Sequence, residues 1–139
     1  MSESMKAGGD FEWLAARAAC SPVKVFEQLR MQITQDVELR NKMCEKQGWK
    51  FAMHNESAIF AVFLDSTAFH RENPYRIVRF RLEDRRIMAR YGDDTDIFIA
   101  TLTLNDDGEC RLRIKDKNYE LWQVRHMALE RLFFEVIGS

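Results

Sequence analysis

The sequence predicts an α+β fold: a six- or seven-stranded antiparallel meander sheet, with N-terminal helices and a C-terminal helix packed on one of its faces. The first observation behind this prediction is a series of four apolar-alternating runs with short polar turns between them, over residues 75–115. The second is a pair of long stripes at helical spacing, over 22–47 and 126–137. We expect a flexible tail over 1–9 and a single domain over 10–139.

Composition narrows the class of protein. The 139 residues are 46% hydrophobic and 31% charged, as in an ordinary soluble globular protein. The net charge is −1, so no overall field draws the chain to nucleic acid or to an anionic membrane. No apolar run is long enough to span a membrane, and the N-terminus lacks the apolar region of a secretory signal. Three scattered cysteines without a CxxC spacing fit reduced thiols, which predicts a cytoplasmic location.

Two helices are predicted at the N-terminus. Asp10 is a suitable N-cap for a short helix over 11–20, which is marginal alone and should dock through the stripe formed by Phe11, Leu14, Ala15 and Ala18. Ser21-Pro22 then begins a second helix that runs to Gln47, where Gly48 provides a left-handed end.

The longer helix carries one broad apolar stripe. Its members recur at a period of 3.6 residues: Val25, Phe26, Leu29, Ile33, Val37, Met43 and Cys44. Asp36 and Arg40 interrupt this stripe four residues apart, so we expect them to pair with each other at its margin.

Strands follow once the period changes to two. We expect them over 49–53, 58–64, 75–82, 86–91, 97–104 and 109–115. The 58–64 run is apolar on both faces, which indicates either a strand covered on both sides or one at an interface, including that of a homodimer. The loop over 65–74 presents Phe69 and His70 as exposed candidates for binding.

The segment 116–124 has two interpretations. Asn118 can cap the start of the last helix, or 116–118 can be a turn that leads into a seventh strand over 119–124. Tyr119, Trp122 and Val124 favour the strand. Residues 126–137 are predicted to be helical in both cases.

One charged surface stands out on the outward face of the predicted meander. Strand alternation places seven basic side chains there, in two patches: Arg79, Arg81, Arg86 and Arg90, and then Arg111, Arg113 and Lys115. Between the patches the fifth strand offers Ile97, Ile99, Thr101 and Thr103. The acidic residues gather in the turns instead, so charge is sorted within a nearly neutral chain.

This surface supports the main functional hypothesis. We predict a non-catalytic cytosolic binding or adaptor protein, which engages an acidic protein partner through the seven basic residues together with Phe69 and His70. Arginine and threonine are also ordinary on the wet side of an antiparallel sheet. Nucleic acid is a third hypothesis, disfavoured because this face lacks base-stacking aromatic residues.

Metal binding and catalysis have little support in the sequence. His54, His70 and His126 have no second ligand at a metal-binding spacing, and no nucleophile or phosphate-binding motif occurs, so we predict no catalytic residue, metal or cofactor. The alternative function is a small-molecule-binding or enzymatic roll, with an aromatic-lined pocket between the sheet and the helices. Its candidate lining is Phe51, Phe60, Phe63, Phe80, Tyr91, Phe98, Phe133 and Phe134.

Overall fold

In the part of the chain that the structure describes, seven strands form one antiparallel sheet in which every strand lies beside its neighbour in the sequence. The computed structural model describes residues 12–65 and 73–136. The strands are β1 (Phe51–Asn55), β2 (Ile59–Leu64), β3 (Ile77–Glu83), β4 (Arg86–Tyr91), β5 (Asp96–Leu104), β6 (Cys110–Ile114) and β7 (Lys117–Tyr119). The predicted meander is therefore confirmed, with seven strands rather than six.

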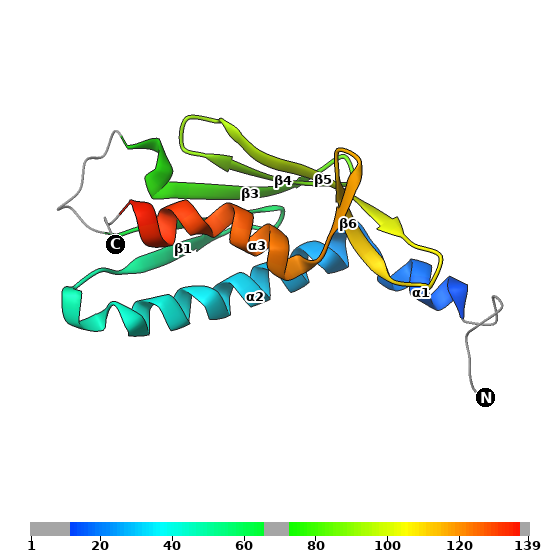
Figure 1. The fold of residues 1–139 in the computed structure, drawn as a ribbon, viewed down its shortest axis with the longest axis horizontal. Helices are drawn as coiled ribbons and strands as arrows, with labels where there is room; N and C mark the ends of the chain where they lie inside the picture. The colour runs from blue at the N-terminus through cyan, green and yellow to red at the C-terminus, as the bar shows by residue number, and fades with distance from the viewer. Residues whose placement is uncertain (1–11, 66–72, 137–139) are drawn as a thin grey trace.

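Helices from both ends of the chain cover one face of this sheet (Figure 1). They are α2 (Pro22–Met43) and α3 (Leu121–Glu130), and α3 continues into a π-helical segment, η4 (Arg131–Glu135). A shorter helix, α1 (Trp13–Ala19), lies at the far end of the molecule, beside the β5–β6 hairpin (Figure 1). Within the described ranges, no helix has the length and apolar character needed to cross a membrane.

The core lies between the sheet and the two long helices. Phe60 of β2 stacks on Phe80 of β3 with 4.6 Å between the ring centroids, and Phe26 of α2 lies 5.3 Å from Phe60. Leu29 and Ile33 of α2 are fully buried against the same cluster. Burying one such side chain contributes about 1.5–3 kcal/mol, so this layer is the main source of stability.

The ends of α2 follow the predicted signals, with one difference. Ser21 Oγ accepts a hydrogen bond of 3.1 Å from the backbone N–H of Lys24, and Gly48 has a φ of 80°. The α-helix itself ends at Met43, and a 3₁₀ turn, η2 (Glu45–Gln47), leads to Gly48. Met43 is exposed, so its predicted place in the buried stripe is wrong, whereas the predicted burial of Cys44, the next residue, is confirmed.

The α2 helix also fastens the first hairpin of the sheet. The side-chain amide of Asn41 donates to the carbonyl of Phe51 at 2.8 Å and accepts from its N–H at 2.7 Å, as a neighbouring strand would. Arg30 Nη1 donates to the carbonyl of Glu56 at 2.7 Å. The bonds from Asn41 satisfy backbone groups that the edge strand β1 would otherwise leave unpaired, and the bond from Arg30 satisfies a carbonyl in the turn after β1.

The preferred interpretation of 116–124 is correct only at Asp116 and Tyr119, because Lys117 and Asn118 belong to the strand rather than to the predicted turn and the strand does not continue past Tyr119. A short strand, β7, ends there, and α3 begins at Leu121. Glu120 and Gln123 form a reciprocal capping box, in which the backbone N–H of Glu120 donates to Gln123 Oε1 at 2.8 Å. This cap outweighs the strand propensity of Trp122 and Val124 because it satisfies free N–H groups at the helix start.

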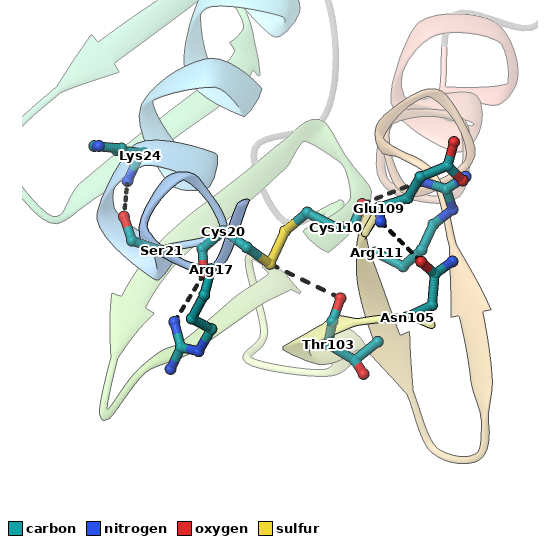
Figure 2. Close-up of a disulfide and its surroundings, with 9 residues drawn as sticks. All are labelled: Arg17, Cys20, Ser21, Lys24, Thr103, Asn105, Glu109, Cys110 and Arg111. Carbon is teal, nitrogen blue, oxygen red and sulfur yellow. Dashed lines mark hydrogen bonds and ion pairs between the residues drawn. A yellow bond between two sulfur atoms is a disulfide. The ribbon is translucent and has the colours of Figure 1, made fainter. Parts of the chain in front are cut away.

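The prediction that all three cysteines are reduced is also wrong. Cys20 and Cys110 form a disulfide across 90 residues of sequence, with 5.4 Å between their Cα atoms (Figure 2). Sequence spacing cannot reveal this pair, because the fold alone brings β6 to the start of α2. Cys44 is a free, buried thiol.

The α1 helix depends on that disulfide. None of its residues is buried, and Leu14, Ala15 and Ala18 are all exposed, so the expected docking through an apolar stripe is wrong for each of these three residues. Asp10 and Phe11 lie outside the described residues. Cys20, the C-cap of α1, is buried, and it ties the helix to β6 (Figure 2).

Candidate partner-binding face of the sheet

Strand alternation gives β1–β4 two different faces. In β3, Val78 and Phe80 point to the helices, whereas Arg79 and Arg81 point the other way. Residues directly opposite one another on neighbouring strands share a face, and the register pairs Arg79 with Ala61 and Arg81 with Ile59. On the other side of β3, Arg79 faces Arg90 and Arg81 faces Met88. The outer face therefore brings three arginines together over apolar neighbours.

The outer face is hollowed over β1–β4. This outer hollow has a volume of about 410 Å³. Its floor is apolar and consists of Ile59, Ala61, Phe63, Ile77 and Met88. Its rim is charged and consists of His54, Glu56, Arg79, Arg81, Arg90 and Asp94. An apolar floor with three arginines at its rim can hold an apolar group and pair with carboxylates beside it.

The floor of the hollow explains why the 58–64 run is apolar on both faces. Phe60, Val62 and Leu64 of β2 are buried under the helices, and Ile59, Ala61 and Phe63 belong to the hollow on the other face. Sequence reasoning placed the arginines outward but missed this floor. The run of apolar residues on both faces was the signal that could have found it.

The rim arginines contact acidic residues from their own strands and turns. Arg90 Nε is 2.7 Å from Asp96 Oδ1, whereas Arg79 Nη1 is 3.8 Å from Asp94 Oδ1 and Arg81 Nη1 is 3.7 Å from Glu83 Oε1. The latter two distances exceed hydrogen-bond length. Exposed pairs of this kind are worth at most about 1 kcal/mol, so an incoming carboxylate can replace them at little cost.

The turn between β4 and β5 keeps a negative charge beside the hollow. Hydrogen bonds from the side chain and the backbone of Thr95 lower the pKa of Asp93 below its ordinary value. Asp94, the next residue, has a φ of 67° and lines the rim. The charge sorting predicted from the sequence is thus local pairing: acidic turns lie beside the arginines and partly neutralise them.

The predicted central strip needs a correction at Ile97. The β4–β5 register shifts at Ala89 and Arg90, so that Arg90 pairs with Asp96 while Ala89 pairs with Phe98. Ile97 is the extra residue of this bulge, and it packs against the core rather than on the outer strip. The position of such a bulge depends on strand pairing, which residue alternation does not contain.

The second predicted basic patch does not join the outer hollow. Arg111 pairs with Glu109 and lines a separate depression together with Gln32 of α2 and Arg125 of α3. Arg113 Nη1 donates to Asn118 Oδ1 of β7 at 3.4 Å. Lys115 has a φ of 59° in the turn after β6, so its predicted place on the strand is wrong.

The remaining predicted residues lie elsewhere. Arg86 is opposite Glu83 at the start of β4 and does not line the hollow. Phe69 and His70 lie outside the described residues.

Two histidines are paired with carboxylates. His54 Nε2 is 2.8 Å from Glu56 Oε2, and His126 Nε2 is 2.7 Å from Glu130 Oε1. Among residues 12–65 and 73–136, no group of three His, Cys, Asp or Glu side chains is arranged to hold a metal ion.

The aromatic side chains proposed to line an internal pocket fall in three places. Phe51, Phe60 and Phe80 are fully buried, and Phe51 lies 4.9 Å from Phe133 between ring centroids. Phe63 belongs to the outer hollow, and Phe134 is exposed on η4. Ring-on-ring contacts of this kind fill the space between the sheet and the helices.

Comparison with known proteins finds no matching family model, no similar curated protein and no similar solved structure. The geometry of this chain must therefore carry the functional argument by itself.

Proposed function

We propose that this protein is a non-catalytic binding or adaptor protein that engages an acidic protein partner through the outer hollow of its sheet. The observation that supports the proposal is the combination of an apolar floor with the guanidinium groups of Arg79, Arg81 and Arg90 at its rim. A partner segment that places an apolar side chain on the floor and carboxylates at the rim satisfies both features.

Arg79 and Arg81 are the strongest candidates for the contact. Their nearest carboxylates are beyond hydrogen-bond length, and both side chains are about half exposed. Arginine binds carboxylates through two parallel hydrogen bonds, which adds geometric specificity to the charge attraction. Arg90 already has a close carboxylate partner in Asp96, so we expect it to position the rim and contribute less to binding.

Charge and shape favour a protein over nucleic acid. Nucleic-acid binding relies on many uncompensated cations, whereas this chain has a net charge of −1 and acidic residues beside its rim arginines. The apolar floor would make no favourable contact with a charged phosphate backbone. A second copy of this chain is a less favoured occupant, because it would bring the same arginines to face each other across a twofold interface.

The predicted cytoplasmic location is separate from this proposal. It rested in part on reduced cysteines, and the Cys20–Cys110 disulfide removes that support, because disulfides are rare in the cytosol and persist in oxidising compartments. Fractionation of the source cells would decide the location.

The test is native mass spectrometry of the protein purified gently from its own cells, followed by binding measurements with the purified partner. We expect the double variant Arg79→Glu/Arg81→Glu to lose the complex. Arg86→Glu is the matched control for each of the single variants Arg79→Glu and Arg81→Glu, which should also weaken the complex, because it makes the same charge change on the neighbouring strand without lining the hollow. Cross-links formed at position Phe63, on the floor of the hollow, should connect this chain to an acidic stretch of the partner.

Several results would contradict the proposal. One is a complex that survives the double reversal, and another is equal loss with Arg86→Glu. A nucleic acid in place of the protein, seen as a raised 260 nm absorbance, would support the third hypothesis. A concentration-dependent homodimer lost in the double variant would identify a second copy as the occupant.

A further inference from the structure

A second concave surface lies on the helical side of the molecule, between α2 and α3. This helical groove has a volume of about 270 Å³. Its walls carry Leu39 and Met43 of α2, Trp122 of α3 and Phe134 of η4, which are between 41% and 59% exposed. Four large apolar side chains gathered in one exposed groove are unusual on a protein surface and mark a candidate binding site.

The other polar side chains along the groove contact one another. Arg125 Nε donates to Asp36 Oδ2 at 2.8 Å and Nη2 to Asp36 Oδ1 at 3.2 Å, and Nη1 reaches Gln32. His126 and Glu130 form the pair described above. The prediction that Asp36 pairs with Arg40 is wrong, because Asp36 forms its ion pair with Arg125 of α3.

Arg40 is thereby left without a carboxylate. Its Nε and Nη2 donate to the carbonyl of Phe133 at 3.1 and 2.8 Å, and its guanidinium carbon lies 4.1 Å from the centroid of the Phe134 ring. Its Nη1 has only the weak acceptor Met43 Sδ, at 4.0 Å. In the part of the chain that the structure describes, Arg40 belongs to no ion pair. It is a fixed, half-buried cation with unused N–H donors in an apolar groove.

The helix geometry at this point is also unusual. Residues Arg131–Glu135 form a π-helical segment, in which the N–H of Val136 donates to the carbonyl of Arg131 at 2.9 Å. The segment buries Phe133 while Phe134 stays at the groove wall, and its Phe133 carbonyl holds Arg40. Short π-helical turns are rare and are found frequently at functional sites.

We propose that the helical groove binds a small apolar monocarboxylic acid, with the carboxylate on Arg40 and the apolar body against Leu39, Trp122 and Phe134. The class follows from charge complementarity at Arg40. Asp36 and Glu130 of the groove already contact Arg125 and His126, whereas Arg40 contacts no carboxylate and lies beside apolar side chains, so it selects one anionic group on an apolar ligand. The volume sets the size, because a cavity of about 150 Å³ holds benzene and larger pockets accept drug-sized ligands. This site is independent of the outer hollow, which lies on the opposite face of the sheet.

Isothermal titration calorimetry with octanoate and with 1-octanol tests the proposal on the intact chain. Both probes have the same chain length, and only octanoate carries the charge. We expect octanoate to bind at least about tenfold more tightly than octanol, since a charge-assisted contact is lost in the alcohol. We also expect octanoate, and not octanol at the same concentration, to raise the unfolding temperature.

Two variants locate the site. Arg40→Gln should weaken octanoate to the level of octanol while leaving octanol unchanged. Leu39→Glu should abolish octanoate binding by repulsion, and it is safe for folding because Leu39 is exposed. Arg86→Gln, which lines neither the helical groove nor the outer hollow, is the control that should bind octanoate normally.

The proposal is overturned if octanoate does not bind, if octanol binds as tightly, or if Leu39→Glu leaves octanoate affinity unchanged. Should Arg40→Gln fail to fold, the probe pair and Leu39→Glu still decide the question.

Discussion

The two faces of the β1–β4 sheet differ although they come from alternate residues of the same strands. Phe80 is 0% exposed beneath α2, and the next residue, Arg81, has a side chain that is 49% exposed on the opposite face. Both faces are apolar at their centre, but only the inner one is covered by helices. The inner apolar face is part of the core because helices bury it, whereas the outer apolar face is not covered by them and is bordered by arginines.

The largest expected effect is on the inner face. Phe80→Ala should lower the free energy of unfolding by about 3–5 kcal/mol, because Phe80 is fully buried and stacked on Phe60. Urea denaturation followed by circular dichroism measures this. A loss below about 1 kcal/mol would mean that the inner face is not the tightly packed one, and the contrast between the faces would fail.

A second prediction concerns the disulfide between Cys20 and Cys110. Cys110→Ser should cost about 2–5 kcal/mol, because the lost disulfide closes a long loop and ties the exposed α1 to β6. Reducing agent should destabilise the wild type to the same degree in thermal unfolding. The variant should not respond to the reductant, and an equal response in both proteins would show that the effect arises elsewhere.

The smallest expected effect is on the outer face. Arg81→Ala should change the unfolding free energy by no more than about 0.5 kcal/mol, since its contact with Glu83 is long and exposed. The same urea experiment, run beside Phe80→Ala, compares neighbouring residues on opposite faces. A loss of several kcal/mol would instead give the outer face a structural role and weaken its assignment to binding.

Much of the architecture was predictable because its signals are local. The period-two runs over 75–115 gave β3 to β6 to within two residues at each end, and Ser21, Pro22 and Gly48 marked the helical region correctly. The candidate site was predictable only in part. Alternation placed Arg79, Arg81 and Arg90 on one face, but it also grouped them with Arg111 and Lys115, which the twist and turn geometry of the later strands move away.

By itself, then, the sequence determined the meander, the helices and the side of the strands on which the arginines lie, because alternation and capping act between residues close in the chain. Tertiary structure alone decided the disulfide between Cys20 and Cys110, the pairing of Asp36 with Arg125 that frees Arg40, and the bulge at Ile97. It also decided that the second apolar face of β2 becomes the floor of a hollow. Each of these depends on which distant segments meet, and that information lies in the packing of the whole chain rather than in any one stretch of it.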